Sequence, residues 1–204
     1  MRLAVLVSGN GTDLQSIIDA VNSGYIKAEI CAVVSDREDA YALERAKKYG
    51  IPATCVTKKK LKKAFYEELL QLLEKVNPDG IVLAGFITIL SNEIIKKFPN
   101  KIINIHPSLI PSFCGKGFYG ENVHRAVYEY GVKYTGCTVH FVTSDTDAGP
   151  IILQEVVRVD DDDTPETIRE KVLEVEHKIL PYAVKFFVEG CLKIEGRKVR
   201  IVKP

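Results

Sequence analysis

The sequence predicts an α/β protein with an open, mostly parallel β-sheet, helices on both faces and antiparallel strands near the C-terminus. Short runs rich in Val, Ile and Leu alternate with segments whose apolar residues recur at helical spacing. The strand-like runs are continuously apolar, which indicates strands that are covered on both faces. Near the C-terminus two such runs are separated only by a turn, as in an antiparallel pair.

Each element follows from this pattern in chain order. We expect strands at 2–7, 29–35, 51–56, 80–86, 101–107, 135–142 and 150–159, helices at 14–21, 39–49, 62–76, 91–97, 121–130 and 165–188, and a hairpin within 191–202 that turns at Glu195 and Gly196. Thr164 and Pro165 suit the N-cap and first turn of the last helix. The stretch 108–122 has no steady period, so we expect a long loop there. The 204 residues suit a single domain, 1–204.

Composition excludes several classes of function. Lys and Arg number 28 against 27 Asp and Glu, so no overall charge attracts nucleic acid or a membrane surface. No apolar run approaches the roughly 20 residues that span a bilayer. The five cysteines are scattered without metal-ligand spacing, which indicates reduced thiols in the cytoplasm. We therefore expect a cytoplasmic protein with small-molecule partners and no metal site.

The first candidate site is SGNGTD at 8–13, between the first strand and first helix. A glycine-rich turn at a helix N-terminus presents backbone N–H groups to an anion such as phosphate. The spacing fits neither a dinucleotide fingerprint nor a Walker A loop. A plain tight turn with Thr12 or Asp13 capping the helix is the alternative, and a carboxylate at Asp13 would repel a phosphate.

The second candidate is NIHPSLIP at 104–111, where Asn104 and His106 share one face of a strand that ends at Pro107. An amide and an imidazole at this edge can hydrogen-bond an oxyanion and move a proton, as acyl transfer requires. The alternative is a strand-end histidine whose hydrogen bonds are satisfied by backbone.

The third candidate is the acidic turn at 143–149, which contains Asp145 and Asp147. Most Asp-Gly turns are only turns. If Asp147 reaches His106, its charge favours the protonated imidazole and keeps that proton available for donation.

Other polar residues have simpler interpretations. KKKLKK at 58–63 is a solvated helix entry, and DDDD at 160–163 is a hydrated turn. His124 and His140 are expected to pack or to face solvent. Glu176 and His177 are expected to be an ordinary surface pair.

Seven segments, in chain order, carry a family resemblance: SGNGTDLQ at 8–15, LAGF at 83–86, ILS at 89–91, NIHPSLIPSF at 104–113, TGCTVHFV at 135–142, DAGPIILQ at 147–154 and EHKILP at 176–181. In these segments the chain resembles the phosphoribosylglycinamide formyltransferases of the folate-dependent formyltransferase superfamily. The resemblance implies the formyltransferase fold: a Rossmann-like N-terminal half, about 1–100, that holds phosphate, and a C-terminal half, about 101–204, that completes a folate cleft.

The resemblance also implies the reaction and its catalytic residues. The amine of phosphoribosylglycinamide attacks the formyl carbon of 10-formyltetrahydrofolate, a reduced folate that serves as cosubstrate, and no cofactor is tightly bound. Asn104 and His106 stabilise the oxyanion, His106 donates a proton, and Asp147 keeps His106 protonated. Either a monomer or a homodimer is compatible with this reading.

The binding residues are likewise implied by the resemblance. Substrate binding falls to Gly11, Thr12 and Asp13 at the phosphate, to Glu176 at the ribose, and to Pro107. Folate binding falls to Lys63, Leu83, Ile87, Thr88, Ile89, Leu90, Ile95, Ile102, Asn104 and Val142. The chain departs from the family at Asp13, where asparagine is usual, and at Thr88, where arginine is frequent.

Relatives and one other class remain as alternatives. A 10-formyltetrahydrofolate hydrolase usually has a preceding regulatory domain, whereas the first strand here begins at Arg2, and it tends to have a second histidine at the position of Pro107. A methionyl-tRNA formyltransferase appends a further domain, whereas this chain ends at Pro204. A sugar-nucleotide formyltransferase would share the catalytic residues. A phosphoribosyl or nucleotide sensor on the same fold would have no need of a proton donor.

Overall fold

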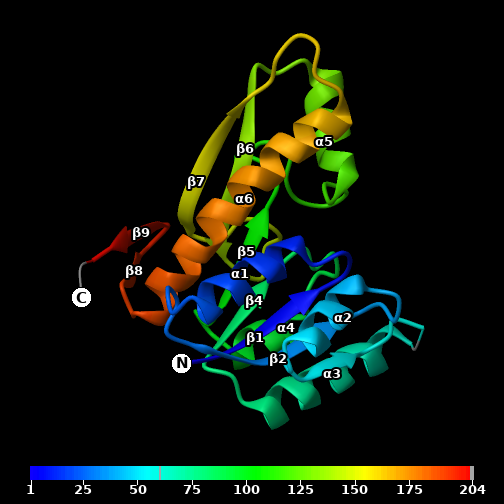
Figure 1. The fold of residues 1–204 in the computed structure, drawn as a ribbon, viewed down its shortest axis with the longest axis vertical. Coiled ribbons are helices and arrows are strands. Elements are labelled where there is room, and N and C mark those ends of the chain that lie inside the picture. Colours follow the sequence, from blue (N-terminus) through cyan, green and yellow to red (C-terminus); the bar gives the residue numbers. More distant parts are fainter. Residues whose placement is uncertain (60, 203–204) are drawn as a thin grey trace. The chain divides into compact units, whose positions relative to one another are not determined.

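The computed structural model describes residues 1–59 and 61–202. The chain divides into two compact units, Met1–Ile103 and Asn104–Pro204. Figure 1 labels the elements and colours them along the sequence. The predicted fold class is confirmed, because the sheet is mixed, mostly parallel, with antiparallel strands toward the C-terminus.

The first unit is a parallel sheet with helices. It contains β1 (Arg2–Val7), α1 (Thr12–Asn22), β2 (Glu29–Ser35), α2 (Tyr41–Lys48), β3 (Ala53–Cys55), α3 (Lys62–Val76), β4 (Gly80–Leu83) and α4 (Asn92–Lys97). Its strands lie in the order β3-β2-β1-β4, and each neighbouring pair is parallel. Leu3, Ala4, Val5, Leu6 and Val7 are each 0% exposed, which requires cover on both faces of β1.

The strand order of this unit determines where a ligand can bind. The chain passes outward from β1 to β2 and β3, and then returns to place β4 on the other side of β1. Open α/β sheets bind ligands at such a reversal, outside the carboxyl ends of the strands. The loops that follow β1 and β4 are therefore the expected binding elements of this unit.

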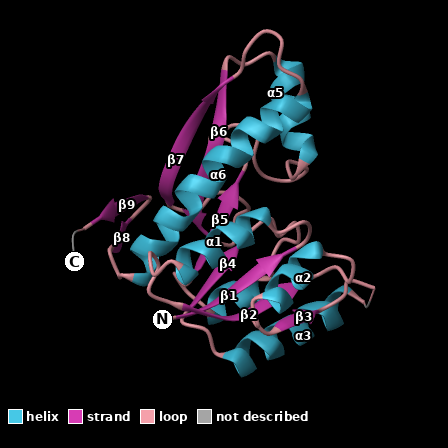
Figure 2. Cartoon of the chain, in the orientation of Figure 1, coloured by secondary structure: helices cyan, strands magenta, loops and turns pink. Residues whose placement is uncertain are grey.

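The strand β5 (Ile102–His106) runs across the boundary between the units. The second unit then contains α5 (Glu121–Tyr130), β6 (Tyr134–Phe141), β7 (Ile151–Arg158), α6 (Pro165–Val188), β8 (Leu192–Glu195) and β9 (Lys198–Ile201). β6 and β7 are antiparallel, β9 pairs in parallel with β7, and β8 closes the hairpin with β9. In Figure 2 the long helix α6 lies along β6 and β7, and it also packs against α5.

Most element boundaries agree with the expectations, and the differences have local causes. The predictions for 29–35, 62–76, 121–130 and 165–188 match the structure. The last helix has the expected N-cap at Thr164, whose side chain accepts from the Thr167 amide. The first helix begins at Thr12 and not at residue 14, because Gly11 supplies a left-handed N-cap. The strand expected at 80–86 ends at Leu83, and the terminal hairpin turns at Gly196 and Arg197.

Several peripheral predictions can be compared with the described residues. None of the five cysteines, all of which lie in the described ranges, forms a disulfide. In the run at 58–63, Lys58 pairs with Asp36 and Lys59 with Glu38, while Lys60 lies outside the described residues. In the acidic turn at 160–163, Asp161 pairs with Lys133, and Asp160 and Asp163 pair with Lys171. None of the helices in the described ranges is both long and apolar enough to cross a membrane.

Candidate active site

The loop after β1 has the geometry of an anion-binding turn. Gly11 has φ 74°, and a Cβ at this position would lie 2.6 Å from the Cβ of Ala42, so only glycine fits. Neither Thr12 nor Asp13 caps α1, which corrects the alternative that they do. The amides of Asn10, Gly11 and Thr12 donate to no other residue that the structure describes. These N–H groups are therefore available to a ligand at the positive end of α1.

The loop after β4 is held against this turn by Ser8. The Ser8 amide donates to the Gly85 carbonyl at 3.1 Å, and the Ile87 amide donates to Ser8 Oγ at 2.9 Å. Both bonds lie at the strand reversal between β1 and β4. These bonds join the loop at 8–13, which we propose binds phosphate and call the phosphate loop, to the start of the segment at 87–90. We propose that this segment binds folate and call it the folate strip.

Asp13 differs in chemical state from an ordinary surface aspartate. Its side chain lies in the first turn of α1, and the residue is 8% exposed. Burial raises the pKa of Asp13 from 3.8 to about 7. Below that pH its carboxyl group is largely neutral, which removes much of its repulsion toward a phosphate.

The substitution Asp13→Asn is expected to stabilise the protein at alkaline pH. Between pH 4 and pH 7 the folded carboxyl retains a proton that the unfolded chain loses, so stability falls as the pH rises and the penalty is complete above about 7. An asparagine side chain carries no such penalty, so the variant should gain about 2–4 kcal/mol at pH 8 and almost nothing at pH 4. Urea unfolding at both values measures this, and parallel pH dependences of the two proteins would contradict it.

The proposed folate residues of the first unit lie in two environments. Ile102, Leu83 and Leu90 are 1%, 6% and 5% exposed and belong to the core. Ile87 and Ile89 are 42% and 54% exposed, which leaves an apolar surface for a planar ligand. The remaining side chains, Ile95 and, in the second unit, Val142, are half-buried.

Two polar residues of the folate set are bound to neighbours. The Thr88 hydroxyl donates to the buried carboxylate of Asp36, which also pairs with Lys58 at 2.7 Å. Lys63 is exposed, pairs with Glu67 at 3.6 Å, and lies one helical turn before Tyr66. The Tyr66 hydroxyl donates to the Ile89 carbonyl at 2.7 Å, so this end of α3 is fastened to the strip.

In the second unit, His106 lies at the end of β5 between two oxygen groups. It is 4% exposed, and its Nε2 is 3.0 Å from the Phe113 carbonyl, to which it must donate because a carbonyl only accepts. Its Nδ1 is 3.7 Å from Asp147 Oδ2. That separation exceeds a direct hydrogen bond but allows strong electrostatic interaction in a buried site. The imidazole therefore has both a backbone partner and a carboxylate partner, which combines the two interpretations of the sequence.

Asn104 is oriented by a residue that the sequence did not identify as functional. Its Nδ2 is 3.1 Å from His140 Nε2, and His140 Nδ1 is 2.9 Å from the Phe141 carbonyl. Since Nδ1 donates to that carbonyl, Nε2 accepts from Asn104 in the neutral ring. Burial lowers the pKa of His140, which is consistent with this tautomer. One N–H of Asn104 is thus fixed, and the other remains available to a ligand.

A β-bulge aims His140 at this cluster. The β6–β7 register shifts between Val139 and His140, so Ile151 faces His140 while Ile152 is left out of the pairing. Bulges of this kind redirect side chains next to active sites. The alternation of Thr138 and His140 in the buried part of the strand is the sequence signal that could have identified His140.

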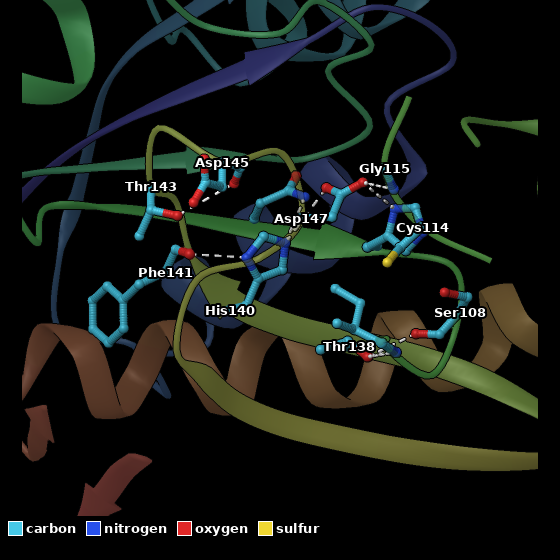
Figure 3. Close-up of polar contacts among 12 residues, drawn as sticks. Ser108, Cys114, Gly115, Thr138, His140, Phe141, Thr143, Asp145 and Asp147 are labelled. Atoms are coloured by element: carbon cyan, nitrogen blue, oxygen red, sulfur yellow. Dashed lines mark hydrogen bonds and ion pairs between the residues drawn. The ribbon is translucent and has the colours of Figure 1, made fainter. Parts of the chain in front are cut away.

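Asp147 is held by its turn and by a loop amide. Its φ is 52°, a left-handed conformation that aspartate tolerates better than most residues. Asp147 Oδ2 accepts from the Gly115 amide at 2.9 Å, and Oδ1 is 3.8 Å from His140 Nε2 (Figure 3). A Cβ on Gly149 would lie 1.7 Å from the Phe141 carbonyl oxygen, so the turn can approach β6 only with glycine there. The structure thus brings Asn104, His106 and Asp147 into one cluster.

Other predicted residues of this unit have the following places. Glu176 lies in α6 and is 7% exposed, so the interpretation as a surface pair with His177 is wrong for Glu176. Pro107 is half-buried directly after β5. His124 lies in α5 and is buried. Burial, with smaller contributions from Arg169 and His106, lowers its pKa to about 4. His124 is therefore a neutral ring at ordinary pH.

An amide, an imidazole and a carboxylate gathered at the end of a buried strand are groups that acyl transfer uses, which indicates an α/β enzyme that transfers acyl groups. The chain belongs to the formyl transferase family, whose model matches residues 1–184. This membership confirms the resemblance inferred from the seven segments.

Individual relatives are similar over nearly the whole chain. Phosphoribosylglycinamide formyltransferase of Escherichia coli K12 is 39% identical over 196 residues, which cover 95% of this chain and 90% of that protein. The trifunctional purine biosynthetic protein adenosine-3 of Bos taurus is 43% identical over 202 residues, which cover 98% of this chain. This chain spans only 19% of that larger protein. The crystal structure of glycinamide ribonucleotide transformylase 1 from Symbiobacterium toebii is 44% identical, has a TM-score of 0.93, and matches 100% of this chain and 94% of that one.

Proposed function

We propose that this protein transfers the formyl group of 10-formyltetrahydrofolate to the amine of 5'-phosphoribosylglycinamide, a step of purine biosynthesis. The observation that carries the proposal is the cluster of Asn104, His106 and Asp147 in a chain whose relatives bear that activity in their names. Cysteines that form no disulfide among the described residues fit the reducing cytoplasm, where we place the reaction.

The acceptor is assigned to the loop after β1 and to Glu176. Gly11, Thr12 and Asp13 receive its phosphate, because the amides of Gly11 and Thr12, which donate to no other described residue, suit a dianion at the start of α1. Glu176 receives the ribose hydroxyls. Pro107, which directly follows His106 in the chain, is also assigned to substrate binding. These assignments explain why the chain keeps a buried glutamate on α6.

The folate is assigned to the strip that follows β4. Ile87 and Ile89 offer apolar surface to its rings, with Ile95 and Val142 at the margins. Lys63 lies at the exposed start of α3, where it can attract the carboxylates of the folate tail. Leu83, Leu90 and Ile102 support the strip from the core, and Thr88 holds it through Asp36.

The chemistry is addition followed by elimination at the formyl carbon. The neutral amine forms a bond to that carbon, the carbonyl electrons move to oxygen, and the free N–H of Asn104 donates to the oxyanion. The bond from carbon to N10 of the folate then breaks, and N10 takes a proton. The amine loses one proton, so the exchange balances as formylated amine and tetrahydrofolate.

His106 moves the proton, and Asp147 stabilises its charged form. The Nε2–H that donates to the Phe113 carbonyl is the donor available to the substrate, since one oxygen acceptor can replace another without loss of a hydrogen bond. The Asp147 carboxylate, whose Oδ2 lies 3.7 Å from Nδ1, attracts the positive charge of the imidazolium from which Nε2 donates its proton.

A formyl-transfer assay tests the proposal. Purified protein with 10-formyltetrahydrofolate and phosphoribosylglycinamide should release tetrahydrofolate, and mass spectrometry should show one formyl group on the acceptor. Omission of the acceptor should abolish release. Turnover in its absence would indicate a hydrolase, and turnover only with an amino-sugar nucleotide would indicate a different transferase; either result refutes the proposed acceptor. Binding without turnover under all conditions would indicate a sensor.

A further inference from the structure

The phosphate loop accepts hydrogen bonds from the first turns of α2. The Ala42 amide donates to the Gly9 carbonyl at 3.1 Å. Arg45, one turn further along α2, donates from Nε to the Asn10 carbonyl at 2.8 Å. Two successive carbonyls of the loop are therefore occupied by donors from one helix.

This arrangement determines the direction of the loop amides. In a trans peptide the carbonyl of one residue and the N–H of the next point in opposite directions. With the carbonyls of Gly9 and Asn10 directed at α2, the N–H groups of Asn10 and Gly11 point away from it. Neither N–H donates to another residue of the described chain. The α2 contacts thus present two adjacent donors on the face opposite the helix.

Arg45 is itself fixed at several points, so it can transmit this constraint. Its Nη1 donates to Gln15 Oε1 at 3.1 Å, and its guanidinium carbon lies 5.0 Å from the centre of the Tyr41 ring. Gln15 lies on α1, where its amide nitrogen also donates to Asp19 at 2.9 Å. Arg45 therefore joins the loop, α1 and α2 with a planar fork that a lysine cannot reproduce.

We propose that Arg45 is a positioning residue for the phosphate of the acceptor. By holding the Asn10 carbonyl, it turns the adjacent amide toward the dianion. This inference rests on the proposed function for the identity of the acceptor. The loop geometry that motivates it does not depend on the folate chemistry.

Steady-state kinetics of Arg45→Met, Arg45→Lys and wild type test the inference. The loss of one charge-assisted hydrogen bond should raise the KM for phosphoribosylglycinamide by about tenfold or more in Arg45→Met. The KM for the folate and kcat should change by less than about threefold, because the reacting groups are untouched. Arg45→Lys keeps the charge and one donor, so its KM should lie between the other two. Lys47→Met removes another charge from the same helix and should match wild type. Among the described residues, Lys47 has an ion pair only with Glu44, at 2.7 Å.

Varying the ionic strength distinguishes a positioning role of Arg45 from simple electrostatic attraction between Arg45 and the phosphate. An effect transmitted through the loop should keep the ratio of KM between Arg45→Met and Lys47→Met nearly constant between low and high ionic strength, because the contact is local. A ratio that falls to one at high salt would overturn the positioning role. Equal KM values for Arg45→Met and wild type at all salt concentrations would also overturn it, although the proposed function would stand.

A second readout keeps the inference testable if the assumed acceptor is wrong. Titration with inorganic phosphate, followed by ³¹P NMR, should show binding to wild type and Lys47→Met that is weakened in Arg45→Met. That result with no formyl transfer would refute the proposed function and support the role of Arg45. Equal phosphate binding by the two variants would refute the role. If Arg45→Met fails to fold by circular dichroism, Arg45→Lys carries both comparisons.

Discussion

Replacement of His106 with alanine is expected to lower kcat for formyl transfer by about 10²- to 10⁴-fold, the usual contribution of a positioned acid or base. His106 is the only imidazole of the described cluster whose Nε2–H faces a replaceable acceptor, the Phe113 carbonyl. The Kd for the folate should change little, because the apolar strip at 87–90 is not altered. Single-turnover rates and folate titration measure the two quantities.

Chemical rescue gives this experiment an internal control. Removing a ring that is 4% exposed leaves a cavity beside Asp147 that free imidazole can enter. Added imidazole should recover part of the lost kcat and should leave wild type unchanged. A His106→Ala variant with normal kcat would remove the proton-transfer role and with it the mechanism.

Asp147→Asn is expected to lower kcat by on the order of 10²-fold with little change in stability. Asparagine has the same size and tolerates φ 52°, and its carbonyl can still accept from the Gly115 amide. The substitution therefore removes the negative charge near His106 Nδ1 and preserves the turn. The effect should be in kcat and not in either KM, since Asp147 acts through the charge on the imidazole that moves the proton.

Asp145→Asn is the matched control for this prediction. Asp145 lies in the same turn but is exposed, and its carbonyl, not its side chain, bonds Thr143 at 3.2 Å. Its kcat should stay within about twofold of wild type, as is usual for surface changes. Combining Asp147→Asn with His106→Ala should add little to the loss from His106→Ala alone, because both act on one proton. Fully additive losses would show that Asp147 acts independently of His106.

The elements were predictable where a local signal marks both ends. Thr164 and Pro165 identify the start of α6, and Asn77 with Pro78 identifies the end of α3. Hydrogen-bonding and steric rules that involve only residues close in the sequence therefore suffice to place these two ends. β4 was predicted three residues too long because Ala84 to Phe86 are as apolar as the strand. They leave it to join the loop after β1 through Ser8, a bond that no local rule contains.

The candidate site divides in the same way. Asn104 and His106 share a face because alternate residues of a strand do so. His140 was expected to pack or to face solvent, because its alternation with Thr138 indicates a shared strand face but not the group that the imidazole contacts. Its contact with Asn104 requires the two strands, and the bulge at Val139 and His140, to be in place. Arg45 gave no signal, because its partner, the Asn10 carbonyl, is a backbone group.

By itself, the sequence determined the alternation of strands and helices and the residue types available for acyl transfer, because these depend on periodicity and on the chemistry of side chains. It also indicated the family, through the resemblance of seven segments. Only the tertiary structure decided how far His106 lies from Asp147, which tautomer His140 adopts and which way the amides of the phosphate loop face. Those quantities depend on groups that are distant in the chain, and the free energy of such contacts exists only once packing has brought the groups together.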